Sequence, residues 1–351
     1  MNRTAAAAII ATAIVGTIGG TVSAVVRGDE PPPPPTTSAP SGTVLYAGAH
    51  LIHDGKEQVR YDAPFDTPSR LVRADEGYLI AQDTGQDGRT SRVFHVTTEG
   101  TTTRLADLAG AWDLNPDGDQ VVGVGADTGK VETRDLDGTI TATWDGPQGA
   151  QNPVWTADGT VLVSTDDGAG GWHLHEWHPK GGSSRLLDRV GYAELAASTD
   201  GTLISGSVGI EGFSVKDENY CLGVAAAETG PGETLSWSTC DWRLNAPGTP
   251  AFSPGSGRIL AVPSESDGFG PGRLATFSAR QGPDTDLRAF NTPPMTMAAV
   301  WLDDQHLVLK GATDFDLDED TGSWLKVCDL DGKCTDTARR AHGDLVLGEQ
   351  G

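Results

Sequence analysis

The feature that most restricts the folds open to this chain is a strand–turn–strand segment that recurs about every forty residues. Its clearest copy covers residues 153–163, PVWTADGTVLV, where two apolar runs flank an Asp-Gly turn. Aligned at that turn, the copies fall at Glu76, Asp117, Asp158, Asp200, Gly255 and Asp304. The intervals run from 41 residues, between 76 and 117, to 55 residues, between 200 and 255. Self-similarity of this period predicts a repeat architecture with one supersecondary unit per copy.

Two further β-like stretches separate successive copies, for example residues 130–136 and 139–144 on either side of an Asp-Gly turn. Four strands per repeat is the size of one blade of a β-propeller. Short strands over residues 43–61 and a single strand over 343–347 can join as one more blade, which would remove exposed sheet edges. We therefore predict an all-β protein in which residues 43–351 form one β-propeller. Seven four-stranded blades are expected, with six as the alternative.

Two copies carry a recognisable motif. Residues 153–163 and 250–262 resemble the repeats of TolB-type, WD-like β-propellers, in which Pro-x-Trp-Ser-Pro-Asp-Gly-x-x-Ile-Ala is typical. The other copies match more loosely. The chain also departs from the family pattern, because the positions equivalent to Trp155 hold Leu114, Ala197 and Phe252. The resemblance covers roughly residues 43–351. It implies an extracytoplasmic propeller that acts as an interaction scaffold, and it leaves the ligand open because fold does not determine function.

The beginning of the sequence is typical of an exported protein. Residues 5–26 carry no charge and follow Arg3. We assign residues 1–27 to an apolar helix that serves as a signal peptide or a transmembrane anchor, with small residues at 22–24 as a possible cleavage position. Residues 28–42 form a proline-rich linker. We expect a single-pass protein of the cell membrane with an extracytoplasmic C-terminal domain, and secretion after signal cleavage is the alternative.

The four cysteines form two pairs that are each centred on a turn. Cys221 and Cys240 are equidistant from a Gly-Pro turn, and Cys328 and Cys334 are equidistant from Asp331. Residues placed symmetrically about a hairpin turn face each other across the two strands. We therefore predict two cross-strand disulfides, which agree with an oxidising compartment. A four-cysteine metal site is the weaker interpretation, because its ligands normally come as closely spaced pairs.

The charge of the chain restricts its partners. Lys and Arg total 25 against 49 Asp and Glu, which gives a formal net charge of −24. Such a surface repels phosphate groups, so nucleic acid is excluded as a partner. We expect a monomer that binds a protein, peptide or glycan at the cell envelope. Contact with the membrane would come only through the N-terminal helix, if that helix is not cleaved.

Two groups of residues are candidates for metal binding. Alternate aspartates in one loop are typical of Ca²⁺ ligands, although the loop lacks the glycine and glutamate of an EF-hand. They are Asp314, Asp316, Asp318 and Asp320. His173 and His175 would point to the same face of a strand, as metal ligands do, but no third ligand is near them in sequence. A solvated acidic loop and a solvent-facing strand are the simpler interpretations, so Ca²⁺ is the one cofactor considered.

Gly-rich, acidic loops occupy the equivalent position in several repeats, between the second and third strands. They are residues 83–88, 166–171, 265–270 and 314–322. In a propeller these loops share one face, and variable loops on a rigid scaffold often carry function. The working site is therefore predicted as a face and not as a set of named residues.

No catalytic signature is visible in the sequence. A nucleophile elbow, a phosphate-binding loop and a zinc-protease motif are all missing. The leading hypothesis is a binding or interaction module at the cell envelope, without evident catalysis. One alternative is a propeller enzyme, a lyase or glycosidase, with carboxylates lining the central channel. Another is an accessory or sensor subunit of a membrane complex.

Overall fold

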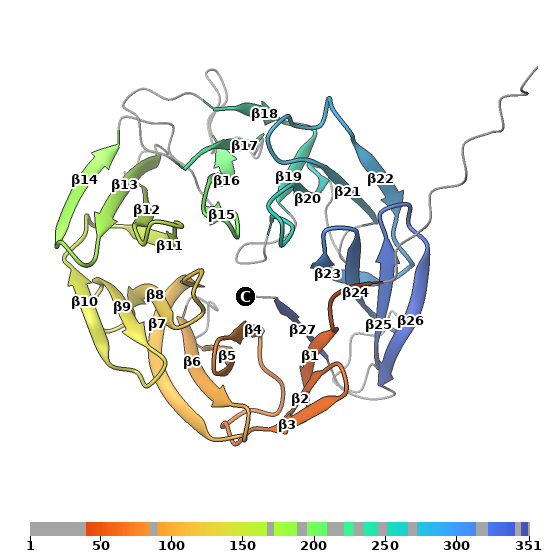
Figure 1. Cartoon of the computed structure of the whole chain (residues 1–351), viewed down its shortest axis with the longest axis horizontal. Helices are drawn as coiled ribbons and strands as arrows, with labels where there is room; N and C mark the ends of the chain where they lie inside the picture. The colour runs from red at the N-terminus through yellow and green to blue at the C-terminus, as the bar shows by residue number, and fades with distance from the viewer. Residues whose placement is uncertain are drawn as a thin grey trace, which may run out of the picture. The chain divides into compact units, whose positions relative to one another are not determined.

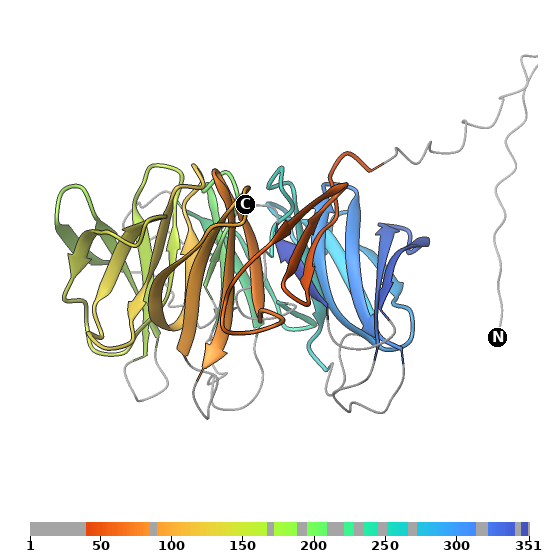
Figure 2. The same cartoon turned by 90° about the horizontal axis from the view of Figure 1, so that it is seen from below.

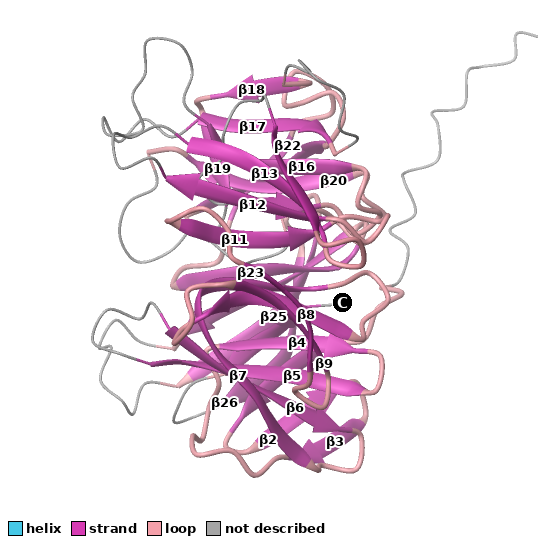
Figure 3. Ribbon diagram, turned by 90° about the vertical axis from the view of Figure 1, so that its left-hand side faces the viewer, coloured by secondary structure: helices cyan, strands magenta, loops and turns pink. Residues whose placement is uncertain are grey.

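The structure is a computed structural model, and every regular element in its described part is a β-strand (Figure 3). The described residues are 40–84, 90–166, 172–187, 195–208, 221–227, 235–244, 251–265, 272–313, 322–340 and 345–349. The predicted apolar helix and most of the linker fall in residues 1–39, outside this set. Within the set, no helix has the length and apolar character needed to cross a membrane.

The described strands form one sheet of eleven strands and four sheets of four strands. The eleven-stranded sheet contains β1 (Leu45–Gly48), β2 (Leu51–Asp54), β3 (Glu57–Arg60), β4 (Arg70–Ala74), β5 (Gly77–Thr84), β6 (Thr90–Thr97), β7 (Thr102–Leu114), β8 (Gln120–Gly125), β9 (Val131–Asp135), β10 (Ile140–Trp144) and β27 (Val346–Glu349). Its spatial order is β10-β9-β8-β7-β6-β5-β4-β27-β1-β2-β3.

Each four-stranded sheet is an antiparallel meander in chain order. The first contains β11 (Ala150–Trp155), β12 (Val161–Asp166), β13 (Trp172–His178) and β14 (Ser183–Leu187). The second contains β15 (Ala196–Ala197), β16 (Leu203–Val208), β17 (Cys221–Ala226) and β18 (Trp237–Thr239). The third contains β19 (Trp242–Leu244), β20 (Arg258–Pro263), β21 (Arg273–Ser278) and β22 (Arg288–Asn291). The fourth contains β23 (Thr296–Asp303), β24 (His306–Ala312), β25 (Ser323–Asp329) and β26 (Cys334–Arg340).

The sheets stand side by side around a central axis (Figure 1). The first strand of each four-stranded sheet lies nearest that axis, together with β4 and β27. Seen from the side, the strands run roughly along the axis, so the turns gather at two opposite faces (Figure 2). An all-β, propeller-type arrangement, as the repeat predicts, is therefore observed.

Two strands explain why one sheet has eleven members. β7 is thirteen residues long and pairs first with β6 and then with β8, with a register shift between Ala109 and Asp113. Gly110 adopts a positive φ of 71° at this point, which glycine tolerates without strain. β27 pairs antiparallel with β1 and parallel with β4. The strand predicted after the last repeat therefore pairs with strands from the start of the domain.

The recurring Asp-Gly turns have a common chemistry. In the turn between β11 and β12, the Asp158 carboxylate accepts hydrogen bonds from the Thr156 hydroxyl and the Thr160 amide at 2.6 and 3.0 Å. Gly159 has a φ of 78° and donates its amide to the Thr156 carbonyl. Asp200 closes its turn in the same way, whereas the Asn115 side chain takes this role at Asp117-Gly118. Glycine supplies the left-handed backbone in all three turns, so each of these hairpins is fixed by local contacts.

The core lies between adjacent sheets, and strands near the axis are buried on both faces. Val161, Leu162 and Val163 of β12 are all fully buried. Trp155 and Trp177 pack with Val122 and Val124 of β8 in one such layer. Truncating a residue such as Leu162 to Ala would cost about 2–5 kcal/mol, because the surrounding strands cannot close the cavity.

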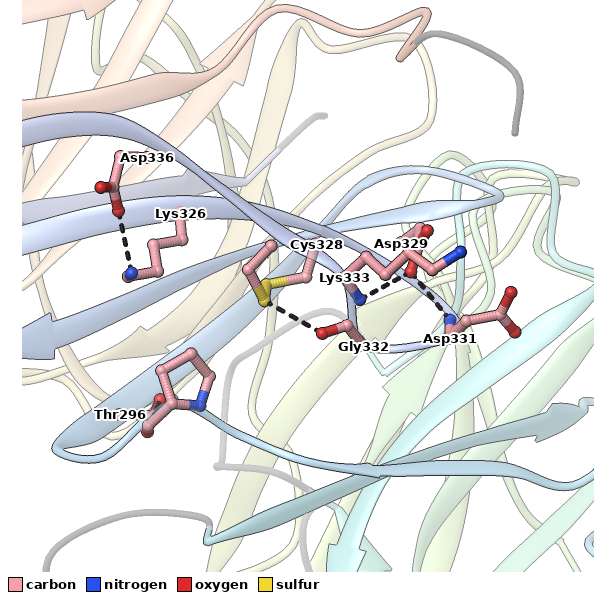
Figure 4. Close-up of a disulfide and its surroundings, with 10 residues drawn as sticks. Thr296, Lys326, Cys328, Asp329, Asp331, Gly332, Lys333 and Asp336 are labelled. Atoms are coloured by element: carbon pink, nitrogen blue, oxygen red, sulfur yellow. Dashed lines mark hydrogen bonds and ion pairs between the residues drawn. A yellow bond between two sulfur atoms is a disulfide. The ribbon is translucent and has the colours of Figure 1, made fainter. Parts of the chain in front are cut away.

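Both predicted disulfides are present. Cys221 and Cys240 join β17 to the residue that follows β18, and Cys328 and Cys334 are cross-strand partners in the β25–β26 hairpin. Their Cα atoms are 4.0 Å apart in each pair. In the second hairpin, the Asp329 carboxylate accepts the amide hydrogens of the turn residues (Figure 4). Turn symmetry alone was enough to predict this pairing.

The last residues of the linker are fixed against the domain. Ser41 donates its amide and its hydroxyl to the Asp303 carboxylate at 2.8 and 3.1 Å. Gly42 lies so close to Leu302 that a Cβ atom there would be 2.4 Å from the Leu302 carbonyl oxygen. The chain therefore enters the domain at the turn that follows β23.

Candidate functional site: a polar pocket on the axis

A pocket of about 130 Å³ lies among the strands nearest the axis. Its walls come from β4, β7, β11, β15 and β27, and continue into the residues that follow β7 and β15. The lining residues with polar or aromatic side chains are Arg70, Trp112, Asp113, Asn115, Asn152, Trp155, Ser198, Thr199 and Glu349. We call this cavity the axial pocket. Its walls come from segments up to 279 residues apart in sequence.

Arg70, at the start of β4, forms a bidentate ion pair at the pocket wall. Its Nε and Nη2 atoms donate to the two carboxylate oxygens of Glu349 at 3.0 and 2.8 Å. Its Nη1 atom donates to the Trp112 carbonyl at 2.6 Å, and its guanidinium lies 4.1 Å from the centroid of the Trp112 ring. Such a planar fork suits a carboxylate. The Arg70 guanidinium is therefore committed to Glu349 and Trp112.

Asp113, in β7, differs from Glu349 because its carboxylate contacts a backbone amide and not a guanidinium. Its Oδ2 atom accepts the backbone amide hydrogen of Trp155 at 2.9 Å. Burial raises the pKa of Asp113 to about 6, with a smaller contribution from the negative charge of Glu349, while the Trp155 amide and the Arg70 charge oppose the rise. Among the described residues, Asp113 forms no ion pair of its own, since the nearby guanidinium contacts Glu349.

Burial also raises the pKa of Glu349, against the attraction of Arg70. The pocket wall thus combines two carboxylates with one guanidinium. Because the pKa values of both carboxylates are raised, Asp113 and Glu349 lose their protons at a higher pH than exposed carboxylates do.

A β-bulge in β11 shapes another part of the pocket wall. The register between β11 and β12 shifts between Gln151 and Val154, and Asn152 adopts a positive φ of 47°. Pro153 lies within this irregular stretch and has no amide hydrogen to donate to a neighbouring strand. Bulges re-aim the residues that follow them. Here the bulge immediately precedes Trp155, whose amide reaches Asp113 across the gap between two sheets.

The Trp155 indole is a buried donor without an acceptor. Trp155 is 5% exposed, and its Nε1 atom has no hydrogen-bond partner among the described residues. Trp301 occupies the same position in the last repeat, and its Nε1 atom donates to the Ala251 carbonyl of the preceding sheet at 3.2 Å. The two indoles are buried alike, but only one is satisfied. A buried N–H group without an acceptor costs free energy, and an oxygen of a molecule bound in the adjacent pocket would remove that cost.

A second pocket, of about 160 Å³, lies beside the first, between the strands β7–β10 and the sheet β11–β14. It includes Asp117, Gln120, Thr141 and Lys180. Asn115, Pro116 and Trp155 line both pockets, so this group forms the wall between them. We call the second cavity the side pocket.

The sequence-predicted site residues lie elsewhere. The Asp314–Asp320 loop is outside the described residues, as are most of the other acidic loops predicted to share one face. His173 and His175 are on β13, with His173 exposed and His175 lying 5.9 Å, centroid to centroid, from Trp144. Burial and the charge of His173 lower the pKa of His175. No described group of three or more His, Cys, Asp or Glu residues is suited to a metal ion, and metal binding stays a prediction.

Sequence reasoning named carboxylates in a central channel only in general terms, and it missed Arg70, Asp113, Trp155 and Glu349. Trp155 carried no distinguishing signal, because Trp is typical of this repeat position and Trp301 fills it in the last copy. Arg70 and Glu349 carried none, since their pairing depends on how the two ends of the domain meet.

Comparison with known proteins agrees with the fold and adds no function. No protein-family model matches the chain, and no curated protein matches it. Among solved structures, a putative 6-phosphogluconolactonase from Bacteroides uniformis is 13% identical, with a TM-score of 0.50, covering 87% of this chain and 99% of that one. A functionally unknown protein from Desulfotomaculum acetoxidans is also 13% identical, with a TM-score of 0.50, covering 89% of this chain and 100% of that one. TolB from Acinetobacter baumannii is 14% identical, with a TM-score of 0.44, covering 88% and 66%.

At such identities the likeness concerns the fold alone. The chain is an all-β protein of the propeller type, and this architecture does not determine its function.

Proposed function

We propose that this chain is an extracytoplasmic, seven-bladed β-propeller that acts as a binding module at the cell envelope, with the axial pocket as its ligand site. The apolar N-terminal sequence would anchor it in the membrane, or be removed on secretion. A peptide or glycan partner would insert one small polar group into the pocket. The two disulfides support an oxidising compartment.

Strand pairing supports the count of seven blades. Four blades are the four-stranded sheets. The eleven-stranded sheet divides into three more if β7 is counted both as the outer strand of one blade and as the inner strand of the next. The blade β27-β1-β2-β3 would then be built from both ends of the domain and close the ring.

The observation that carries the binding proposal is the position of the Asp113 carboxylate beside the cavity, without an ion pair among the described residues. An ionised carboxylate beside a cavity, without a basic contact of its own among the described residues, costs free energy unless a ligand compensates it. A carboxylate that only stabilised the fold would be expected to sit in an ion pair, as Glu349 does with Arg70.

The direct test measures binding by the full chain and by an Asp113→Asn variant. The two proteins would be screened by thermal shift against a panel of small amines, polyols and short peptides. Ligands that stabilise only the wild-type protein would support the axial pocket. The proposal would be refuted if ligands stabilise both proteins equally. Non-reducing electrophoresis of alkylated cells would test the compartment, because both disulfides should be formed in vivo.

A second candidate is an enzyme that uses Asp113 as a general acid or base. It is favoured by the pKa of about 6, which suits proton transfer near neutral pH, and by the second carboxylate of Glu349 in the same wall. Turnover of a glycoside or uronide substrate that disappears in Asp113→Asn, with binding retained, would support the enzyme over the binding module.

A further inference from the structure

We propose that the axial pocket binds a primary ammonium group through Asp113, with an acceptor oxygen next to that ammonium taking the hydrogen of Trp155 Nε1. This inference rests on the proposed function and names its ligand class. The chemistry is that of an α-amino amide, as at the amino end of a peptide, or of a 2-amino alcohol.

The charges of the pocket exclude an anionic ligand. Arg70 donates through Nε, Nη1 and Nη2 to Glu349 and to the Trp112 carbonyl, and its ring-stacked face is covered by Trp112. An entering carboxylate or phosphate would therefore meet two carboxylates and a committed guanidinium. A cation would meet Asp113, which has no ion pair among the described residues. The net charge of −24 also raises the local concentration of cations around the protein.

The indole adds a requirement for an acceptor. Trp155 lines the axial pocket, and its amide already donates to Asp113, so the ring and the carboxylate belong to one local arrangement. Because its Nε1 atom lacks the carbonyl partner that Trp301 has, the oxygen of a bound ligand would satisfy it. Asn152 lines the same cavity and offers its side-chain amide to such a ligand, whereas the Asn115 amide is engaged with Asp119 and Gln120.

The volume of the axial pocket limits the size of the ligand group that can enter it. A cavity of about 150 Å³ holds one benzene molecule. The axial pocket, at about 130 Å³, therefore accepts about six non-hydrogen atoms. Glycinamide and 2-aminoethanol both fit this limit, and each carries an ammonium group beside an oxygen.

Isothermal titration of the full chain at pH 7.5 tests the ammonium requirement. Glycinamide and 2-aminoethanol are compared with acetamide and ethylene glycol, which keep the oxygen and lack the charge. We expect the two amines to bind and their neutral counterparts to bind at least tenfold more weakly. Whichever amine binds with the higher affinity shows whether an amide oxygen or a hydroxyl oxygen is the better acceptor for Trp155 Nε1.

Two variants locate the site. Asp113→Asn keeps an acceptor for the Trp155 amide and removes the charge, so we expect at least a tenfold loss of affinity for both amines. Asp117→Asn makes the same chemical change in an exposed residue of the side pocket and should leave the affinity unchanged. Loss of binding in Asp117→Asn together with full binding in Asp113→Asn would overturn the proposal and place the amine in the side pocket.

The indole is observed directly in the full chain labelled with ¹⁵N-tryptophan. Trp155→Phe identifies the Trp155 signal by its disappearance, and that signal should move downfield when glycinamide is added. The Trp301 signal should stay in place, because its acceptor is the Ala251 carbonyl. Amine binding without any movement of the Trp155 signal would refute the role of the indole.

The outcomes separate this inference from the proposed function. If neutral or anionic compounds bind in a way that depends on Asp113, the pocket is a binding site and the ammonium class is wrong. If no compound binds and Asp113→Asn changes nothing, the proposed function fails as well.

Discussion

Replacing Asp113 by Asn should make the protein more stable at neutral pH, which is unusual for a change at a half-buried polar position. The folded-state pKa of Asp113 is raised from 3.8 to about 6, chiefly by burial. The favourable term from a raised carboxyl pKa is fully present below the unfolded pKa and is lost as pH rises through the folded pKa. Above pH 6 the wild-type protein therefore holds a charge that disfavours the folded state, and the Asn variant does not.

The size of the effect follows from the shift. Two pKa units correspond to about 3 kcal/mol, and because Asp113 is only partly buried this is an upper value. The difference in free energy of unfolding between Asp113→Asn and the wild-type protein should be near zero at pH 4 and grow between pH 4 and pH 7. Arg70 and Glu349 face Asp113 in both proteins, and the coupling to Glu349 makes the measured midpoint a property of the pair.

This difference is measured by urea unfolding at several pH values from 4 to 7.5. Tryptophan fluorescence monitors the transition. Asp117→Asn is the matched control, because Asp117 is exposed. A difference that does not change with pH, or an Asp113→Asn variant that is less stable at pH 7.5, would refute the reasoning. Either result would mean that the Asp113 charge is compensated in the folded protein.

Three further predictions follow from other contacts. Glu349→Gln leaves Arg70 buried without its partner and should cost about 3–5 kcal/mol in urea unfolding, whereas the double change to Leu at both positions should cost less. An equal loss in the single and double variants would contradict that reasoning. Replacing Cys221 and Cys240 together by Ser should cost about 3 kcal/mol in urea unfolding, and reduction of the wild-type protein should cost more, because it also opens Cys328–Cys334. Ca²⁺ should raise the melting temperature only while the Asp314–Asp320 loop is intact, and an equal rise after its neutralisation to Asn would exclude that loop.

The repeat could be found from sequence because its signals are local. Asp158 and Gly159 close one hairpin through contacts within five residues, so the same letters predict the same turn wherever they recur. The cysteine pairs were equally accessible, since cross-strand partners lie at equal distances from a turn. The fold class and both disulfides therefore follow from short-range chemistry.

The continuous strand β7 and the axial pocket could not be predicted in this way. Whether β7 continues from its pairing with β6 into its pairing with β8 depends on the path of the backbone at Gly110, which the repeat pattern does not predict. Arg70 and Glu349 meet only because β27 lies beside β4, although they are 279 residues apart. A site whose members come from five strands becomes visible only when the ring of sheets is assembled.

The position of β27 also has a consequence for the order in which the chain can fold. Strands β1, β2 and β3 are the first of the domain to be synthesised, but their inner neighbour is the last. At ordinary rates of synthesis, β1 waits on the order of tens of seconds with an unpaired edge. During that interval Tyr46 and Ala47 present open backbone groups to any other extended chain, including another nascent copy. A premature stop before residue 346 would make this exposure permanent.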